Sequence, residues 1–446
     1  MKEKKEIVIG SIDDSVLERN RQRIAFTRAK RDLRRIRASV SFRIGVHITT
    51  AVRKPWLLLL LPITFPWLIF RMGLERLGRI THINSGMGDD EITIARNSIV
   101  LFPTNGVGFG HFTRLFSVAK KMKRDDPELE IVFFTTMPTL HIPYAEGFPT
   151  YHLSGRHKHS QMATNTWNTL VDEMLSLVLE IHKPKEFIYD GAYPYRGMLN
   201  AINDKKWLRK TWVRRGTFRK GSRIPVDSIQ HFDLIIHPND VVEIPDSDLE
   251  HDVEVLRVPP ITLVDVDEMW NRKSVRHRIG IPSESQVAYV QLGAGRINDI
   301  ESEINLVISA LLKYDNMHVV LGESMLGERL QINQERVHII RDYPNSLYLK
   351  GFDISVQAGG YNSFHEMRIM KIPTLFLPNL NTGMDDQVAR CENAVVEGWG
   401  LVNLDRSPKG LENDIEGLLS IKFEGIADCN TDNGADNISQ YLLRDD

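Results

Sequence analysis

The stretch LFPTNGVGFGHFTRLFSVAKKM, residues 101–122, joins an apolar strand-like run to a helical run through a cluster of glycines. Gly106, Gly108 and Gly110 permit backbone conformations and close approaches that a side chain would forbid. The helix that follows would direct free N–H groups and its positive end toward the same corner. His111 stands at the start of that helix, where an imidazole can exchange a proton near neutral pH. The stretch therefore predicts either a ligand site beside an imidazole or a tight turn with a packed histidine.

The residues on both sides of this stretch continue the same alternation of strand and helix. In the first half, the predicted strands are SIVLFPT, EIVFFTT, EFIYD, KTWVRR and FDLIIHP, with helices over 112–123 and 166–182. In the second half, they are QVAYVQL, MHVVLGE, RVHIIRD, FDISVQA, TLFLPN and LVNL, with helices over 300–313, 363–370, 387–397 and about 438–443. Such alternation is typical of parallel sheets wrapped by helices.

The predicted fold class is therefore α/β, with two doubly wound, Rossmann-like domains that face each other across a cleft. The predicted divisions are 1–14 disordered, 15–96 a basic helix and hydrophobic segment, 97–258 the first domain, 259–270 a hinge and 271–446 the second domain. Ligands of open α/β sheets bind beyond the carboxyl ends of the strands. The loops that follow the strands are thus the place to look for a site.

A second strand-to-helix corner follows FDISVQ. Gly359 and Gly360 would let the backbone approach a phosphate, and Asn362 or Ser363 can cap the next helix. The N-terminus of that helix then forms an anion site, and Glu366 lies one turn in, where it can accept two hydrogen bonds from a ribose diol. The alternative is an ordinary capped helix with a solvated glutamate.

A third corner, PNLNTGMDDQVAR, covers residues 378–390 and again follows a strand. Asp385, Asp386 and Gln387 form a polar cluster at the start of a helix. Carboxylates and an amide together offer the acceptors and donors that sugar hydroxyls require. The alternative is a helix N-terminus enriched in acids, which is common in proteins.

The charge of the chain is unevenly distributed. Its 446 residues carry a net charge of −2, yet residues 21–54 contain eleven Lys or Arg and one acid, Asp32. A basic arm on an acidic body indicates an anionic partner at one end. Residues 15–51 are predicted to be helical, although the alternation over 42–48 would also suit a strand. The two cysteines, Cys391 and Cys429, favour no disulfide framework and suit a reducing cytoplasm.

The run WLLLLLPITFPWLIF, residues 56–70, holds no charge. Fifteen residues fall short of the roughly 20 that a helix needs to span a bilayer, and Pro62 and Pro66 interrupt them. Trp56 and Trp67 suit the headgroup level. The run is therefore predicted to dip into one leaflet beside a basic helix that faces anionic lipid. The alternative is a buried, proline-kinked element.

The three corners together resemble those of the GT-B glycosyltransferases, in particular the family that adds N-acetylglucosamine to the lipid-linked peptidoglycan precursor. Gly110-His111 matches the Gly-His of that family's first glycine-rich loop. Residues 360–366 resemble its glycine-started helix with a ribose-binding glutamate, and IPTLFLP with Asp386-Gln387 resembles its donor-sugar segment. The resemblance covers about 98–405 and is weaker over 151–258. The phrase AGGYNSFHE…DDQ…AR also resembles bacterial surface-polysaccharide glycosyltransferases with a basic, hydrophobic extension.

The resemblance implies an inverting, metal-independent glycosyltransferase that needs no cofactor and uses a nucleoside-diphosphate sugar, such as UDP-N-acetylglucosamine. It implies His111 as general base, with Asp190 as the second candidate; Asp190 can equally be a strand-end acid that caps a loop. The acceptor is expected to be lipid-linked or a surface glycan, at the anionic cytoplasmic face of the plasma membrane. The implied donor-binding residues are Gly293, Gly295, Arg296, Gly359, Gly360, Tyr361, Asn362, Ser363, Glu366, Asp385, Asp386 and Gln387.

Two other functions are compatible with the same sequence features. A GT-B nucleotide-sugar hydrolase or epimerase would keep the fold and change the reaction. A non-catalytic GT-B protein would bind the donor at the membrane without turnover. Nucleic-acid binding by the basic run 209–223 is not favoured, because its TWV reads as a buried strand. The acid-x-acid triplets at 246–248 and 265–267 are attributed to chance in an acid-rich chain and not to a metal site.

Overall fold

The computed structural model describes residues 36, 39–76, 95–104, 108–156, 162–203, 205–214, 226–242, 253–293, 300–323, 329, 332–380, 385–421 and 432–444. These residues belong to two compact units, Met1–Thr93 and Ile94–Asp446. The tail predicted to be disordered, 1–14, lies outside the described residues, as do Gly106, Gly295 and Arg296.

The first unit contains two neighbouring helical segments. Its elements are α2 (Val40–Arg53), the 3₁₀ helix η1 (Pro55–Leu60) and α3 (Leu61–Arg76). Ser39 is the N-cap of α2: its backbone is extended, and its side chain accepts a hydrogen bond from the N–H of Phe42. Residues 40–51 of the predicted 15–51 helix are helical, and residues 15–35 lie outside the described residues. Residues 42–48 are helical and not a strand.

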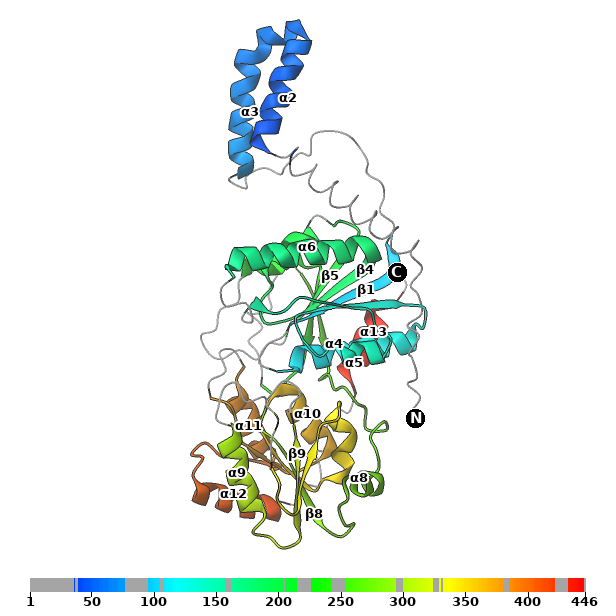
Figure 1. Cartoon of the computed structure of the whole chain (residues 1–446), viewed down its shortest axis with the longest axis vertical. Helices are drawn as coiled ribbons and strands as arrows, with labels where there is room; N and C mark the ends of the chain where they lie inside the picture. The colour runs from blue at the N-terminus through cyan, green and yellow to red at the C-terminus, as the bar shows by residue number, and fades with distance from the viewer. Residues whose placement is uncertain are drawn as a thin grey trace, which may run out of the picture. The chain divides into compact units, whose positions relative to one another are not determined.

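The second unit begins with a seven-stranded parallel sheet in the order β3-β2-β1-β4-β5-β6-β7 (Figure 1). Its strands are β1 (Arg96–Pro103), β2 (Glu130–Thr135), β3 (Thr150–His152), β4 (Pro184–Asp190), β5 (Arg209–Val213), β6 (Leu234–Pro238) and β7 (Glu254–Val258). The helices between them are α4 (Gly110–Asp125), α5 (His141–Ala145), α6 (Thr164–His182), α7 (Arg196–Asn203) and the 3₁₀ helix η3 (Val226–His231). We call this part, residues 95–258, the first lobe.

The pleat of β1 explains why helices cover both faces of this sheet. Ile99 and Leu101 belong to the core that contains α4, whereas Val100 and Phe102 belong to the core that contains α6. All four side chains are fully buried. Successive side chains of a strand point to opposite faces, so a continuous apolar strand needs a cover on each side.

A six-stranded parallel sheet in the order β10-β9-β8-β11-β12-β13 forms the second lobe, residues 271–421. Its strands are β8 (Gln286–Gln291), β9 (Met317–Gly322), β10 (Val337–Ile340), β11 (Ile354–Gln357), β12 (Thr374–Phe376) and β13 (Gly400–Val402). Its helices are α8 (Arg272–Ile279), α9 (Ile300–Leu311), the 3₁₀ helix η5 (Asn345–Gly351), α10 (Tyr361–Met370), α11 (Gln387–Val396) and α12 (Pro408–Ser420). The two parallel sheets predicted from the alternation are confirmed.

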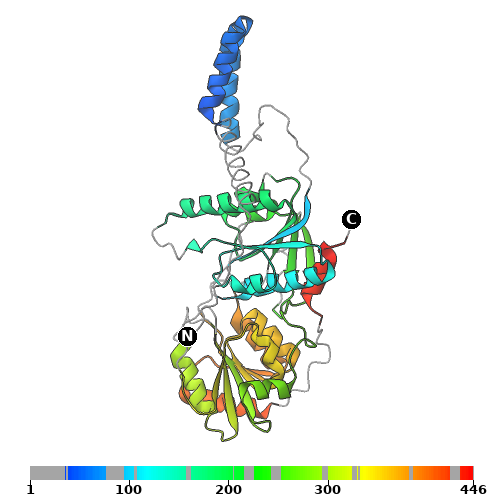
Figure 2. The same cartoon turned by 45° about the vertical axis from the view of Figure 1, so that its right-hand side comes forward.

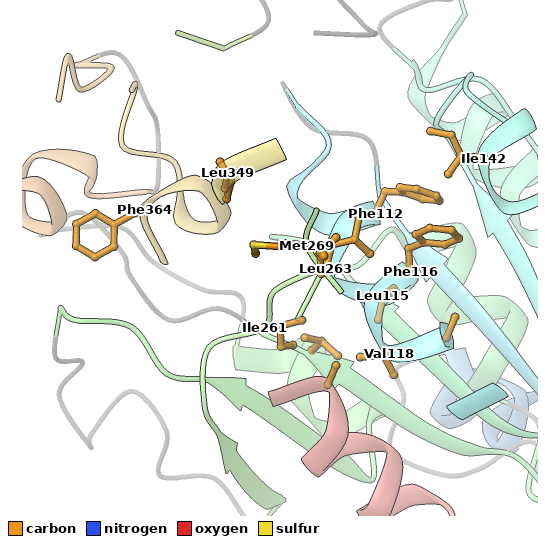
Figure 3. Close-up of a cluster of buried hydrophobic side chains, with 14 of the residues drawn as sticks. Phe112, Leu115, Phe116, Val118, Ile142, Ile261, Leu263, Met269, Leu349 and Phe364 are labelled. Atoms are coloured by element: carbon orange, nitrogen blue, oxygen red, sulfur yellow. The ribbon is translucent and has the colours of Figure 1, made fainter. Parts of the chain in front are cut away.

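The predicted hinge, 259–270, is packed between the two lobes. Figure 3 shows Leu263 and Met269 between Phe112 of α4 and Leu349 of η5. All four belong to one continuous core that draws residues from both sheets. Burial of this kind removes apolar surface from water and gives the lobes a shared interface.

The last helix, α13 (Gly434–Leu442), lies against the first lobe and not the second. It packs on α4 and β7, and the Ser439 hydroxyl donates to Asp125 of α4 at 2.7 Å. The preceding Asn433 is bonded to the connecting segment, since its amide donates to the carbonyl of Thr262 at 2.9 Å. The sequence-based division assigned this helix to the second domain by its position in the chain, whereas its contacts place it with the first lobe.

Candidate active site

The first corner brings a histidine, a carboxylate and an arginine together. His111 lies in the first turn of α4, and its Nδ1 is 2.7 Å from Oδ1 of Asp190, the last residue of β4. Arg114, one turn along α4, donates from Nε to Asp190 Oδ2 at 2.9 Å and from Nη2 to Oδ1 at 2.7 Å. The two predicted candidates for a general base, His111 and Asp190, therefore form a single pair.

The charge of Asp190 determines what His111 can do. Burial opposes ionisation of this carboxyl, but the positive charges of Arg114 and His111 outweigh burial and hold the pKa of Asp190 below its usual range. Nδ1 of His111 lies between Asp190 Oδ1, which only accepts, and Arg114 Nη2, 2.9 Å away, which only donates, so its contacts suit both tautomers. In the Nδ1–H tautomer, the ring donates to Asp190. Its Nε2 then carries the lone pair that a base needs, and the partly exposed side chain, 22%, can reach a substrate.

An aromatic ring connects this corner to the second lobe. Tyr361 is the first residue of α10, is 2% exposed, and donates from its hydroxyl to the carbonyl of Asn239 in the first lobe at 2.8 Å. The Arg114 guanidinium lies over its ring at 5.6 Å from the centroid, and the Arg390 guanidinium lies 5.8 Å from the same centroid. Cation–π attraction of this kind is strongest where water is excluded.

Arg390, on α11, is the most heavily bonded side chain of the site. It is fully buried and donates from Nη2 to Asp240 of the first lobe and to Asp385 of the third corner, both at 2.7 Å. Its Nη1 donates to the carbonyl of Gly359 at 3.1 Å. One guanidinium thus ties together the second corner, the third corner and the carboxyl end of β6.

The second corner has the backbone expected of a ligand-binding turn. Gly359 has φ +76°, and a Cβ at this position would lie 2.3 Å from Sγ of Cys391, so glycine is required here. Gly360 is the N-cap of α10 and provides no side-chain cap. The first N–H groups of α10 therefore lack the side-chain acceptor that Asp386, Asn271, Ser407 and Asn433 provide at the starts of four other helices.

Two amides at this corner have buried atoms with no hydrogen-bond partner among the residues that the structure describes. They are Oδ1 of Asn362 and both polar atoms of the Gln357 side chain, at the end of β11. Buried polar groups are nearly always paired, so such atoms mark a place where a ligand or water completes the bonding. Ser363, by contrast, donates to the carbonyl of Gly360 at 3.1 Å.

Glu366 lies one turn into α10, as predicted, but in an apolar setting. It is half-buried near Tyr289 and Tyr343, and it bonds Ser346. Burial raises the pKa of Glu366 to about 7, so near neutral pH the side chain can accept or donate a hydrogen bond. The neighbouring His365 is buried, with Nε2 3.4 Å from Asp240 Oδ1.

The predicted sugar-binding trio of the third corner already has partners within the chain. Asp385 is held by Arg390, and Asp386 caps α11 by accepting from the N–H of Ala389 at 3.1 Å. Gln387 Oε1 accepts from the N–H of Asn379 at 3.0 Å.

The remaining predicted residues lie at the expected strand ends. Gly108 lies two residues before α4, and Gly110 is the first residue of α4. Gly293 is exposed, follows β8 and has φ +102°. Asp265, from a discounted acid-x-acid triplet, is ion-paired with Lys121 of α4 and accepts from Asn433 at 2.9 Å. This triplet therefore supports the contact between α4, the connecting segment and α13.

The sequence-based prediction missed the residues that connect the lobes: Arg114, Asp240, Tyr343 and Arg390. Thr113 Oγ1 and Tyr343 Oη are 3.1 Å apart, and the Phe109 and Tyr343 rings are 5.5 Å apart, so Tyr343 of the second lobe rests on the start of α4. The signal that could have found Asp240 is its place directly after the strand LIIHP. No local pattern marks Arg114 as a partner of a residue 76 positions away.

The comparisons with known proteins agree with this architecture. The predicted fold class, GT-B with two Rossmann-like lobes, is confirmed, because solved structures of this fold cover most of the chain. The UDP-GlcNAc 2-epimerase from Methanocaldococcus jannaschii matches with a TM-score of 0.53 at 15% identity, covering 77% of this chain and 99% of its own. A spinosyn forosaminyltransferase matches with a TM-score of 0.51 at 13% identity, covering 72% of this chain and 90% of its own.

One curated relative also resembles the chain in sequence. An uncharacterized glycosyltransferase of Methanopyrus kandleri is 28% identical over 204 residues, which are 44% of this chain. The matched part spans 55% of that relative's length. No protein-family model matches the chain.

Proposed function

We propose that this chain is an inverting, metal-independent glycosyltransferase that moves a sugar from a nucleoside diphosphate to an acceptor hydroxyl. The observation that carries the proposal is the meeting of three corners from two lobes. Arg114 beside His111 contacts Tyr361 of the second corner, and Arg390 joins Tyr361, Gly359 and Asp385. We infer that the imidazole in one lobe acts as a base beside a helix start in the other lobe that binds an anion.

In this proposal, His111 removes the proton of the acceptor hydroxyl through Nε2. Asp190 holds the ring by accepting from Nδ1–H and stabilises the imidazolium that forms. The acceptor oxygen forms its bond to the anomeric carbon as the bond from that carbon to the diphosphate breaks. A single displacement of this kind inverts the anomeric centre.

The leaving diphosphate would meet positive charge that is already in place. The start of α10 offers N–H groups without a side-chain cap, and its helix dipole adds partial positive charge there. Asn362 Oδ1, which has no partner among the described residues, can accept a hydrogen bond from a ligand hydroxyl. Because fixed dipoles of this kind stabilise developing charge, the proposed reaction does not need a metal ion.

The donor and acceptor belong to the same proposal. UDP-N-acetylglucosamine is favoured as donor by the resemblance of residues 360–366 and of Asp386-Gln387 to the peptidoglycan transferase family. A lipid-linked or surface-glycan acceptor at the cytoplasmic face of the plasma membrane is favoured by the basic, apolar extension that precedes residue 77. Membrane-bound acceptors suit an enzyme that is held at the anionic lipid surface.

A second candidate is a nucleotide-sugar 2-epimerase or hydrolase with the same donor site. The likeness to the UDP-GlcNAc 2-epimerase from M. jannaschii favours this candidate, since the match covers 99% of that epimerase chain. The two reactions differ in what they require. Release of UDP without any acceptor indicates hydrolysis, and conversion of the UDP-sugar to its epimer without net release of UDP indicates epimerisation. Release of UDP that depends on an acceptor indicates transfer.

The donor is tested by melting the protein with a panel of nucleotide sugars. A ligand that binds only the native state raises the melting temperature, and at about 100 times its Kd it adds about 2.7 kcal/mol. We expect UDP and UDP-N-acetylglucosamine to raise the melting temperature and GDP or dTDP sugars to raise it less. A panel in which no nucleotide stabilises the protein would contradict the proposed function.

Glu366→Ala is expected to weaken UDP binding by roughly 1–3 kcal/mol, because hydrogen bonds to a carboxylate are among the stronger ones. The side chain lies one turn into the uncapped helix α10. Calorimetric titration with UDP measures the loss. Glu392→Ala, an exposed glutamate on α11, is the matched control and should bind UDP as the unmodified protein does. Equal affinity in both variants would remove Glu366 from the donor site.

A further inference from the structure

The first unit exposes apolar side chains along one face of a helix and carries further apolar side chains on the other face. Residues 55–74 form a 20-residue stretch that contains an 18-residue window of mean hydropathy 1.9, and none of that window is buried. Leu59 is 83% exposed, Ile63 70% and Phe70 64% on one face, and the half-buried Phe65 lies on the opposite face. A helix that is apolar on every side belongs in a protein core or in lipid, and within the described unit this one has no core around it.

The helix is also longer than the sequence indicated. Pro62 falls in the first turn of α3, where the missing N–H has no intrahelical role, and the helix continues past Pro66 to Arg76. Twenty helical residues at 1.5 Å each span about 30 Å, the thickness of the hydrocarbon core of a bilayer. The expectation that this segment is too short to cross rested on the fifteen uncharged residues 56–70 and on the two prolines within them.

A second helix runs back along the first. Figures 1 and 2 show α2 beside α3, and the two elements contact each other. His47 Nε2 of α2 lies 3.0 Å from Thr64 Oγ1 of α3, and the His47 and Phe65 rings are 6.5 Å apart. Thr49 donates back to the carbonyl of Gly45 at 2.9 Å. The polar side chains of His47, Thr49 and Thr64 are therefore bonded within the hairpin, as lipid requires.

The charges of the hairpin lie at its two ends. Between residues 33 and 74 there are seven Lys or Arg and no Asp or Glu. Arg43 and Arg71 lie toward the open end, and Arg53 and Lys54 form the turn between α2 and η1. Long basic side chains at such ends extend into anionic headgroups. This pattern favours an anionic lipid bilayer, because a protein partner would give no reason to exclude acids.

We propose that α2, η1 and α3 form a helical hairpin that is inserted in the bilayer and anchors the chain. Its open end stays at the cytoplasmic face, and its turn, with Arg53 and Lys54, extends to the opposite headgroups. α2 has 14 residues, about 21 Å, so it is about 9 Å shorter than the hydrocarbon core, and local thinning of the bilayer with outward extension of the basic side chains accommodates it. This proposal does not depend on the proposed glycosyl transfer. It replaces the shallower placement, in one leaflet, that the sequence predicted.

The anchor is tested on the full chain in membranes of the cells that express it. Washing with high salt and then with alkaline carbonate releases proteins held only by charge. The hairpin should keep the protein in the pellet through both washes. Release by salt would overturn the proposal in favour of surface binding, and a soluble oligomer that never pellets would overturn it in favour of pairing with a second copy.

Two sets of variants make the test specific. Leu59→Arg with Ile63→Arg should move most of the protein to the supernatant, since an arginine at the middle of a membrane helix strongly opposes insertion. Val396→Arg, at a residue 85% exposed on the second lobe, should leave the protein in the pellet. If both variants divide between pellet and supernatant in the same way, the proposal is overturned. An unchanged melting temperature of the soluble Leu59→Arg/Ile63→Arg variant shows that the rest of the chain is folded.

The topology is read by labelling single cysteines in a Cys429→Ser background, because Cys391 is fully buried. In sealed vesicles, a membrane-impermeant maleimide should label Lys54→Cys from the side opposite to the one that labels Glu146→Cys, an exposed residue of the first lobe. Labelling of both positions from the same side would contradict a hairpin that reaches the far headgroups.

Discussion

Replacing His111 with alanine is expected to slow sugar transfer by about 100-fold or more while UDP binding stays unchanged, because a lost general base costs about this factor. The expectation depends on the 2.7 Å contact between His111 Nδ1 and Asp190, which orients the ring so that Nε2 is the atom that takes a proton. The measurement is kcat with the best donor of the nucleotide panel, beside a calorimetric titration with UDP.

The matched control is His141→Ala, an exposed histidine at the start of α5. It should retain the kcat of the unmodified protein. Asp190→Asn should lower kcat in the same direction as His111→Ala, because a neutral amide no longer stabilises the imidazolium. A His111→Ala variant with full turnover would show that another group, or an activated water, removes the acceptor proton.

Replacing Arg390 with methionine is expected to destabilise the protein by about 3–5 kcal/mol, because removing one partner of a buried ion pair leaves the other uncompensated. Arg390 is fully buried, and so is Asp240 at 1% exposure. The two residues come from different lobes, so the loss should appear as a lower melting temperature of the whole second unit. Denaturant unfolding followed by tryptophan fluorescence measures it.

Arg368→Met provides the comparison for Arg390. Arg368 also binds a carboxylate with two nitrogens, at 3.0 and 2.6 Å from Glu397, but both side chains are 20% exposed. Partly solvated pairs contribute about 0–1 kcal/mol. Asp240→Asn added to Arg390→Met should recover part of the loss, because it removes one of the stranded charges. Equal losses for Arg390→Met and Arg368→Met would contradict the importance assigned to the buried pair.

The same pair sets the direction of acid sensitivity. Burial opposes ionisation of Asp240, but Arg390 outweighs it and holds the pKa of this carboxyl well below its usual range. A carboxyl with a lowered folded-state pKa stabilises the fold above its unfolded pKa of about 3.9, and that stabilisation is lost as the pH falls below it. The carboxyl of Asp190 acts in the same sense.

The strands and helices of both lobes follow from local patterns. The runs SIVLFPT and FDISVQA were predicted as strands and contain β1 and β11. Short apolar segments that alternate with helices are typical of strands buried in a parallel sheet. The places of His111 and Glu366 at helix starts follow from the same patterns. Strand ends of parallel sheets share one edge, so the corners could be expected near each other.

The contacts between distant segments could not be read in this way. Asp240 and Arg390 are 150 positions apart, and their bond depends on how two lobes pack. The return of α13 to the first lobe depends on Asn433 and Ser439, whose partners lie far away in the sequence. The helix around residues 56–70 extends to Arg76 beyond the apolar run by which the sequence measured it, and it continues past Pro66.

A crystal structure of the protein with UDP is the most direct test of the claim that these corners hold one ligand. We expect the diphosphate to contact the first N–H groups of α10, with Glu366 toward the ribose and His111 on the side where the sugar would leave. A nucleotide bound to an outer face of either sheet, out of reach of both His111 and α10, would contradict it.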